Sequence, residues 1–148
     1  MQKLSIIGSS RIAEEHIKVA HQAGFKIINI YSSRKNSKNA IDLSRKYKIK
    51  NQKNYKSFLK QIESNGSNVL IAGRINDNAK YLKDILKLNC FIFIEKPIFI
   101  NFQKFEKYEK FKKKIFVGYN RVYYKNISLL KKLLKKEKNL EVICNCPE

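Results

Sequence analysis

The chain has 148 residues, enough for one domain with a buried core, and hydrophobic residues make up 43% of it. This composition excludes a disordered chain, and the longest apolar run, 90–94, is too short to span a bilayer. With 32 basic and 12 acidic residues the net charge is +20, which favours anionic partners. Because lysines occur in every predicted helix, we interpret most of this charge as solvent-exposed surface.

The cysteines are too few and too irregularly spaced to form a framework. Cys90, Cys144 and Cys146 match neither a secreted disulfide pattern nor the spacing of a common zinc site, so we expect reduced thiols and no bound metal. Residues 1–3 lead directly into the first predicted strand, which leaves no room for a signal peptide. A cytoplasmic location is therefore the expectation.

A short apolar run over residues 3–7 predicts the first strand, which ends directly at Gly8. Two small serines follow, and apolar residues at helical spacing then predict a helix that ends near Gly24. The order strand, tight turn, helix makes a phosphate site, because the N–H groups at the helix start point outward. Gly8, Ser10 and Ala13 have the spacing of the dinucleotide fingerprint, although Ser10 stands where a second glycine is usual. The alternative is an ordinary strand-turn-helix unit of an α/β protein.

The rest of the chain continues this alternation. Strands are predicted over 25–31, 49–53, 68–72, 90–94 and 115–119, with one more beginning near 140. Helices are predicted over 38–47, 55–62, 81–88 and 127–134, the last basic and amphipathic, and aromatic residues at 102, 105, 108 and 111 indicate another helix that faces the core. Polar turns are expected at 32–37 and 73–77. The pattern predicts an α/β fold, a doubly wound, Rossmann-like parallel sheet of order 3-2-1-4-5-6 between two helical layers.

Unusual turns follow five of the predicted strands. In a parallel sheet the carboxyl ends of the strands meet at one edge, and ligands bind in the crevice beyond it. We therefore expect these turns to converge on one site, and their agreement carries more weight than any single motif. The turns are Gly8-Ser9-Ser10, Ser32-Ser33-Arg34, Gly73-Arg74-Ile75, Glu95-Lys96-Pro97 and Gly118-Tyr119-Asn120-Arg121.

The turn after the second strand bears on the choice of dinucleotide. An NAD site usually has an acidic residue there for the ribose 2′-hydroxyl, whereas a 2′-phosphate favours arginine and small hydroxyl donors. Here Ser33, Arg34 and Lys35 stand in place of the acid. The sequence therefore favours NADP over NAD, and the alternative is a solvated basic turn.

Lys96 is the candidate for chemistry. It precedes Pro97, which requires extended backbone at Lys96 and so directs this residue from the strand end toward the crevice. An amine beside a bound cofactor can orient a hydroxyl or take part in proton transfer. A Glu-Lys-Pro tripeptide is also common on protein surfaces, so this assignment depends on the other motifs.

Taken together, the motifs Gly8-x-Ser10-x-x-Ala13 with His16, Ser33-Arg34, Glu95-Lys96-Pro97 and Gly118-Tyr119-Asn120-Arg121 resemble the amino-terminal half of the Gfo/Idh/MocA family. The resemblance implies a Rossmann domain that binds NADP or NAD, and hydride transfer on sugars or cyclitols. It implies a catalytic role for Lys96, which would position or polarise the reacting hydroxyl, whereas we expect His16 to be structural. The positions expected to bind the cofactor are Gly8, Ser9, Ser10, Arg11, Ile12, Ser33, Arg34, Gly73, Arg74, Glu95, Lys96, Asn120 and Arg121.

The chain departs from the family pattern in two ways. The family usually has Thr-Pro after the fourth strand and a histidine a few residues later, where this chain has Gly73-Arg74 and Asn78. Family members also continue into a second, sheet-containing domain that supplies substrate contacts. We expect residues 1–121 to form the dinucleotide-binding domain and residues 122–148 to form a linking helix and the start of that second domain, whose remainder a partner chain could supply.

The expected function is therefore that of the nucleotide-binding half of an NAD(P)-dependent oxidoreductase. The alternative is a non-catalytic dinucleotide-binding module, either truncated or one subunit of a split enzyme. A nucleic-acid binder is a third hypothesis, which the charge supports but no recognition motif does. No membrane partner is expected.

Overall fold

The computed structural model describes residues 1–98, 106–119 and 124–136. The chain divides into two compact units, Met1–Gly118 and Tyr119–Glu148. In the second unit the described element is the helix α5 (Lys125–Lys136), which confirms the amphipathic helix predicted there. Within the described ranges, no helix combines the length and hydropathy that a membrane span requires.

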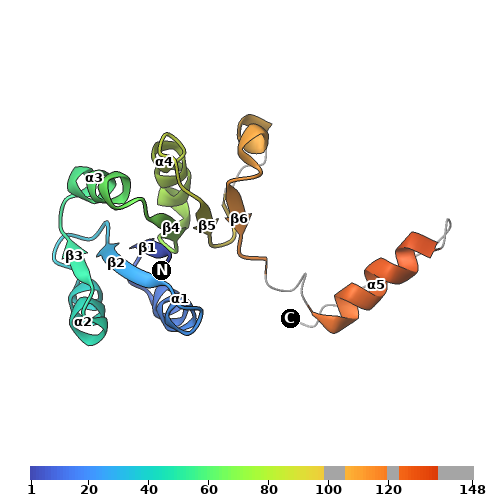
Figure 1. The fold of residues 1–148 in the computed structure, drawn as a ribbon, viewed down its shortest axis with the longest axis horizontal. Helices are drawn as coiled ribbons and strands as arrows, with labels where there is room; N and C mark the ends of the chain where they lie inside the picture. The colour runs from blue at the N-terminus through green and yellow to red at the C-terminus, as the bar shows by residue number, and fades with distance from the viewer. Residues whose placement is uncertain (99–105, 120–123, 137–148) are drawn as a thin grey trace. The chain divides into compact units, whose positions relative to one another are not determined.

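A parallel sheet forms the centre of the first unit (Figure 1). Its described strands are β1 (Lys3–Ile7), β2 (Lys26–Tyr31), β3 (Lys50–Gln52), β4 (Asn68–Ile71), β5 (Ile92–Ile94) and β6 (Ile115–Val117). They lie in the order β3-β2-β1-β4-β5-β6, and each neighbouring pair is parallel. The predicted strand order and direction are confirmed.

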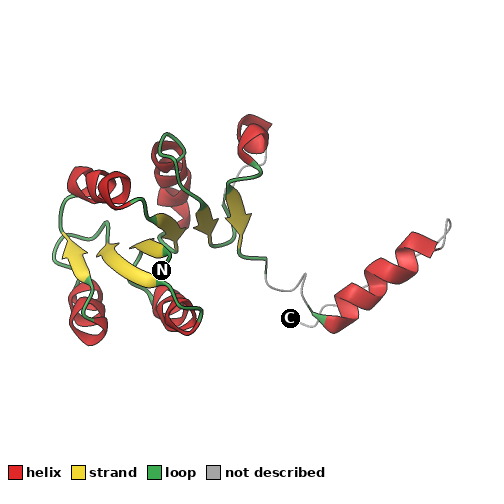
Figure 2. Cartoon of the chain, in the orientation of Figure 1, coloured by secondary structure: helices red, strands yellow, loops and turns green. Residues whose placement is uncertain are grey.

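Helices cover both faces of this sheet (Figure 2). They are α1 (Arg11–Gln22), α2 (Lys38–Tyr47), α3 (Tyr55–Asn65) and α4 (Ile75–Ile85). The first two pack on one face, over a core that includes Ile6 and Ile17, and the other two pack on the opposite face, over a core that includes Phe58 and Leu82. The three predicted layers are thus present.

Local sequence sets where three of these helices begin. Ser10, Ser37 and Asn54 each accept a hydrogen bond from the backbone N–H three residues later, at 3.2–3.3 Å. Such a cap satisfies an otherwise unpaired N–H group and typically stabilises a helix by about 1 kcal/mol. The starts of α1 and α2, which both follow strands that end at the carboxyl edge, are therefore well defined.

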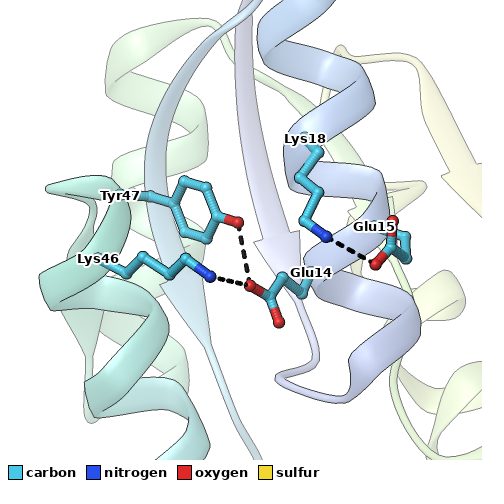
Figure 3. Close-up of polar contacts among 5 residues, drawn as sticks. All are labelled: Glu14, Glu15, Lys18, Lys46 and Tyr47. Atoms are coloured by element: carbon cyan, nitrogen blue, oxygen red, sulfur yellow. Dashed lines mark hydrogen bonds and ion pairs between the residues drawn. The ribbon is translucent and has the colours of Figure 1, made fainter.

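A polar contact joins α1 to the last turn of α2 (Figure 3). Glu14 of α1 accepts hydrogen bonds from Lys46 Nζ at 2.8 Å and from the Tyr47 hydroxyl at 3.0 Å. These two bonds, that from Lys46 first, lower the pKa of Glu14 below its usual value. Along α1 itself, Lys18 Nζ donates to Glu15 Oε1 at 2.8 Å. The contact keeps the last turn of α2 beside α1.

Some predicted boundaries are wrong. The helix α4 begins at Ile75, inside the segment 73–77 predicted as a turn, because Arg74 already has the extended backbone of a helix N-cap. The strand β5 begins at Ile92 rather than at Cys90, which lies before the strand and is half-buried against the core.

The segment predicted as an aromatic helix is described only in part. Residues Glu106–Phe111 form a 3₁₀-helix, whose three residues per turn match the spacing of Tyr108 and Phe111. Both aromatic rings pack against the core under α3 and α4, as the stripe predicted. Phe102 and Phe105 lie outside the described residues, as does the strand predicted from about 140.

Candidate functional site

The strand ends are aligned at one edge of the sheet. Ile7 pairs with both Tyr31 and Ile71, Ile71 pairs with Ile94, and Ile94 pairs with Val117. These residues end β1, β2, β4, β5 and β6, so the five unusual turns all begin at the same edge. The common edge expected from the sequence is confirmed, and the turns after β1, β2 and β4 are the ones that enclose a cavity there.

A cavity of about 490 Å³ lies at this edge, between the turns that follow β1, β2 and β4. Among its described lining residues four are basic and none is acidic, so they present a positive surface. Five are serines, and Ser9 Oγ lies 3.3 Å from Ser32 Oγ and 3.2 Å from Ser37 Oγ. The lining residues are Ile7, Gly8, Ser9, Ser10, Ser32, Ser33, Arg34, Lys35, Asn36, Ser37, Lys38, Asn39, Ala72, Gly73, Arg74 and Tyr81.

The turn at Gly8 brings two strand ends unusually close. Gly8 has φ +119°, and a Cβ added there would lie 2.1 Å from the carbonyl oxygen of Ala72. The chain then enters α1 at Ser10, whose hydroxyl is engaged in capping the helix. Ser10 stands at the second glycine position of the fingerprint. Its side chain is small, and its hydroxyl also caps the helix.

The start of α4 also borders the cavity. Arg74 is its N-cap residue, but the Arg74 side chain accepts no hydrogen bond from the helix. The first N–H groups of α4 are therefore not capped by a side chain. Behind Gly73 lies Asn78, which is 1% exposed and whose Oδ1 has no hydrogen-bond partner in the described part of the chain. Free N–H groups at a helix start favour an anionic ligand group.

Glu95 connects the turn after β5 to two neighbouring elements. Its Oε1 lies 2.6 Å from His16 Nε2 of α1, and its Oε2 accepts a hydrogen bond from the Lys96 backbone N–H at 3.2 Å. A Cβ added to Gly118 would lie 3.2 Å from the same carboxylate. Glu95 therefore holds the backbone of Lys96 beside α1 and the end of β6, and His16 has a structural contact in this arrangement.

The cavity brings together seven of the predicted cofactor-binding residues. They are Gly8, Ser9, Ser10, Ser33, Arg34, Gly73 and Arg74. The other four that the structure describes are not among the lining residues: Arg11 and Ile12 lie in the exposed first turn of α1, and Glu95 and Lys96 lie farther along the same edge. Asn120 and Arg121 lie outside the described residues.

Sequence reasoning missed part of the cavity wall. Ser37, Lys38 and Asn39 line it at the start of α2, and the position of Ser37 just before a helical pattern is a signal that could have identified them. Tyr81 also lines it, ten residues after the end of β4, where only the tertiary fold places it at the edge. No pattern in the sequence separates Tyr81 from an ordinary core aromatic.

Tyr81 keeps its hydroxyl proton over a wide pH range. The residue is 4% exposed, and its ring packs against Tyr31 and Tyr55. Burial raises the pKa of Tyr81 to about 12, although a hydrogen bond from Ser33 acts in the opposite direction. The phenol can therefore serve as a neutral hydrogen-bonding group beside the cavity.

The same pKa predicts a loss of stability at alkaline pH. The Tyr81 phenol ionises near pH 10 when unfolded and near pH 12 when folded, so its contribution is complete below pH 10 and is lost as the pH rises toward 12. We expect Tyr81→Phe to reduce the fall in the free energy of unfolding between about pH 9 and 11.5, measured by urea denaturation. Tyr124→Phe, at a 52% exposed position, is the control and should leave the fall unchanged. An equal fall in wild type and Tyr81→Phe would contradict the assignment.

Comparison with known families agrees with this geometry. The family model GFO_IDH_MocA, described as an oxidoreductase family with an NAD-binding Rossmann fold, matches residues 3–119. The chain belongs to this family. The resemblance seen in the motifs is confirmed, and the Gfo/Idh/MocA match extends from β1 to the turn after β6.

Solved structures of the same fold include several sugar and cyclitol dehydrogenases. The WlbA dehydrogenase from Bordetella pertussis, in complex with NADH and UDP-GlcNAcA, has a TM-score of 0.74 at 15% identity, over 91% of this chain and 42% of that one. The myo-inositol 2-dehydrogenase from Lactobacillus plantarum has a TM-score of 0.73 at 17% identity, over 91% and 41%. The UDP-N-acetylglucosamine 3-dehydrogenase GnnA from Acidithiobacillus ferrooxidans has a TM-score of 0.73 at 12% identity, over 90% and 43%.

At these identities the likeness shows the fold. The chain spans about two fifths of the length of these relatives. Comparison with curated proteins gave no match.

Proposed function

We propose that this Gfo/Idh/MocA chain binds a nicotinamide dinucleotide at the carboxyl edge of its sheet and serves hydride transfer on a sugar or cyclitol. The observation that carries the proposal is the positive cavity bounded by the turns after β1, β2 and β4. The substrate class is suggested by relatives that are named as inositol and UDP-sugar dehydrogenases.

The residues present fit a dinucleotide. The turn from Gly8 to Ser10 leads into α1, whose first N–H groups and dipole favour a diphosphate. Arg34 and Arg74 both line this cavity, from the turns after β2 and β4, and can neutralise phosphate charge. Because none of the described lining residues is acidic, that part of the wall does not oppose an anionic ligand.

The same wall supports NADP as the preferred dinucleotide. Arg34 and Lys35 line the cavity directly after β2, where an NAD site usually has an acid. The hydroxyl groups of Ser32, Ser33 and Ser37 lie on the same turn and can donate hydrogen bonds to a 2′-phosphate. A carboxylate in this position would repel that phosphate, and none is present.

Lys96 is proposed as the residue that handles the proton of the substrate hydroxyl. It follows β5 at the same edge of the sheet, and the Glu95 carboxylate holds its backbone N–H. Bound nicotinamide would supply the hydride-transfer chemistry. When the hydroxyl-bearing carbon is oxidised, the amine of Lys96 would accept the hydroxyl proton, and in the reverse direction it would return that proton.

A fluorescence titration with NADPH and NADH tests the proposal. Because the chain carries a charge of +20, the measurement should be made at about 0.15 M salt, with ATP as a polyanion control. We expect both reduced dinucleotides to bind more tightly than ATP, and NADPH to bind about tenfold more tightly than NADH, the effect of one charge-assisted contact. Failure of both to bind at millimolar concentration would overturn the proposed function.

A further inference from the structure

A second, smaller cavity lies beside the dinucleotide cavity. Its volume is about 120 Å³, and it shares five lining residues of the 32–37 turn with the larger cavity. Its other walls come from the first turns of α2 and from the end of β3. The turn after β2 is therefore accessible from two sides, and we call the smaller space the corner cavity.

Gln52, the last residue of β3, lines the corner cavity. Its side chain is 8% exposed, and its Nε2 is buried without a hydrogen-bond partner in the described part of the chain. Buried donors in native proteins are nearly always paired with protein, water or ligand. An acceptor placed in the corner cavity would satisfy this donor.

The basic residues around the corner cavity favour an anionic group as the hydrogen-bond acceptor for Gln52. Arg34, Lys35 and Lys53 line it, and no acidic residue of the described part of the chain does. Ser37, which also lines it, is the N-cap of α2, so the positive end of that helix dipole lies here. Its volume of about 120 Å³ is large enough for a phosphate group.

We propose that the corner cavity is a phosphomonoester subsite, in which Gln52 donates to a phosphate oxygen while Lys53 and Arg34 neutralise its charge. The proposal rests on the proposed function, because the phosphate is then the 2′-phosphate of NADP bound in the adjoining cavity. Free inorganic phosphate has the same chemistry, and the experiment separates the two sources. In either case Gln52, at the end of β3, and Lys53, directly after it, are specificity-determining residues beyond the turn after β2.

The test measures four ligands on three variants. Binding of NADPH, NADH, 2′-AMP and inorganic phosphate is compared in wild type, Gln52→Leu and Lys53→Gln. Lys50→Gln is the matched control, because Lys50 is an exposed lysine of the same strand that does not line the corner cavity. We expect Gln52→Leu and Lys53→Gln to weaken NADPH and 2′-AMP about tenfold each and to leave NADH unchanged, with Lys50→Gln like wild type.

A direct signal comes from the side-chain amide of Gln52 in ¹⁵N–¹H spectra of the wild type, which should shift when 2′-AMP is added. Because this measurement uses the wild type, it tests the contact between Gln52 and phosphate even if Gln52→Leu does not fold. If phosphate shifts the amide but no dinucleotide binds, the subsite stands with free phosphate as its ligand and the proposed function is wrong.

If NADPH and NADH bind equally and neither variant changes them, the subsite and the preference for NADP are wrong, and the proposed binding of a nicotinamide dinucleotide stands. If no ligand binds and the Gln52 amide does not move, both are wrong.

Discussion

Gly8→Ala is expected to lower the free energy of unfolding by at least about 4 kcal/mol, a large share of the stability of an ordinary domain. The new Cβ would lie 2.1 Å from the carbonyl oxygen of Ala72 and 2.6 Å from its carbon. Both are main-chain atoms, and the N–H of Ala72 donates to the carbonyl of Ile7 at 2.8 Å, so relief of the clash would break the pairing of β1 with β4. The φ of +119° is itself nearly inaccessible to alanine.

Gly24→Ala is the matched control for this prediction. Gly24 also has a positive φ, +78°, but a Cβ there would meet no atom within 4 Å. Its cost should be about 1–2 kcal/mol, from backbone conformation alone. Urea denaturation followed by far-ultraviolet circular dichroism measures both variants. If Gly8→Ala were no less stable than Gly24→Ala, the close approach of β1 to β4 would be refuted.

Arg34→Glu is expected to weaken NADPH binding by more than a hundredfold, or about 3 kcal/mol, and to leave NADH binding within about threefold of wild type. Arg34 lines both the dinucleotide cavity and the corner cavity, so its guanidinium adjoins the proposed position of the 2′-phosphate. A carboxylate there would repel the phosphate, whereas it could accept hydrogen bonds from the ribose hydroxyls of NADH. The measurement is the fluorescence titration with both nucleotides.

Arg45→Glu separates this local effect from the general field of a highly basic chain. Arg45 is an exposed residue near the end of α2, it lines neither cavity, and its replacement changes the net charge by the same amount. The affinity of the Arg45→Glu variant for NADPH should fall only slightly at about 0.15 M salt. An equal loss of NADPH and NADH affinity in Arg34→Glu would contradict the role of Arg34 at the 2′-phosphate.

The sequence alone indicated that Gly8 and Arg34 belong to the site, but for different reasons. Gly8 ends an apolar run before a helical pattern, which is a local signal for a tight turn. The close contact with Ala72, some sixty positions later, is a property of the β1–β4 pairing and cannot be seen from either segment alone. Arg34 was noticed because a basic residue follows the second strand where an NAD site usually has an acidic one. The structure shows in addition that Arg34 lines two cavities.

The α4 boundary shows where local patterns mislead. The predicted turn over 73–77 contains polar residues, yet helix α4 has already begun at Ile75 and presents Tyr81 and Leu82 to the core. Burial of those side chains against β4 and β5 outweighs the weak helix preference of asparagine and aspartate in the first turn.

The sequence by itself determined the alternation of strands and helices, the strand order, and the five turns that meet at one edge, because each follows from apolar periodicity and the right-handed connection of parallel strands. Only the tertiary structure decided which turns enclose a common cavity. It also placed Tyr81 and Gln52 beside that site, since the role of Tyr81 depends on its burial and that of Gln52 on an unpaired buried amide, which arise when distant segments pack. Such properties belong to the assembled layers, and no single segment of the chain encodes them.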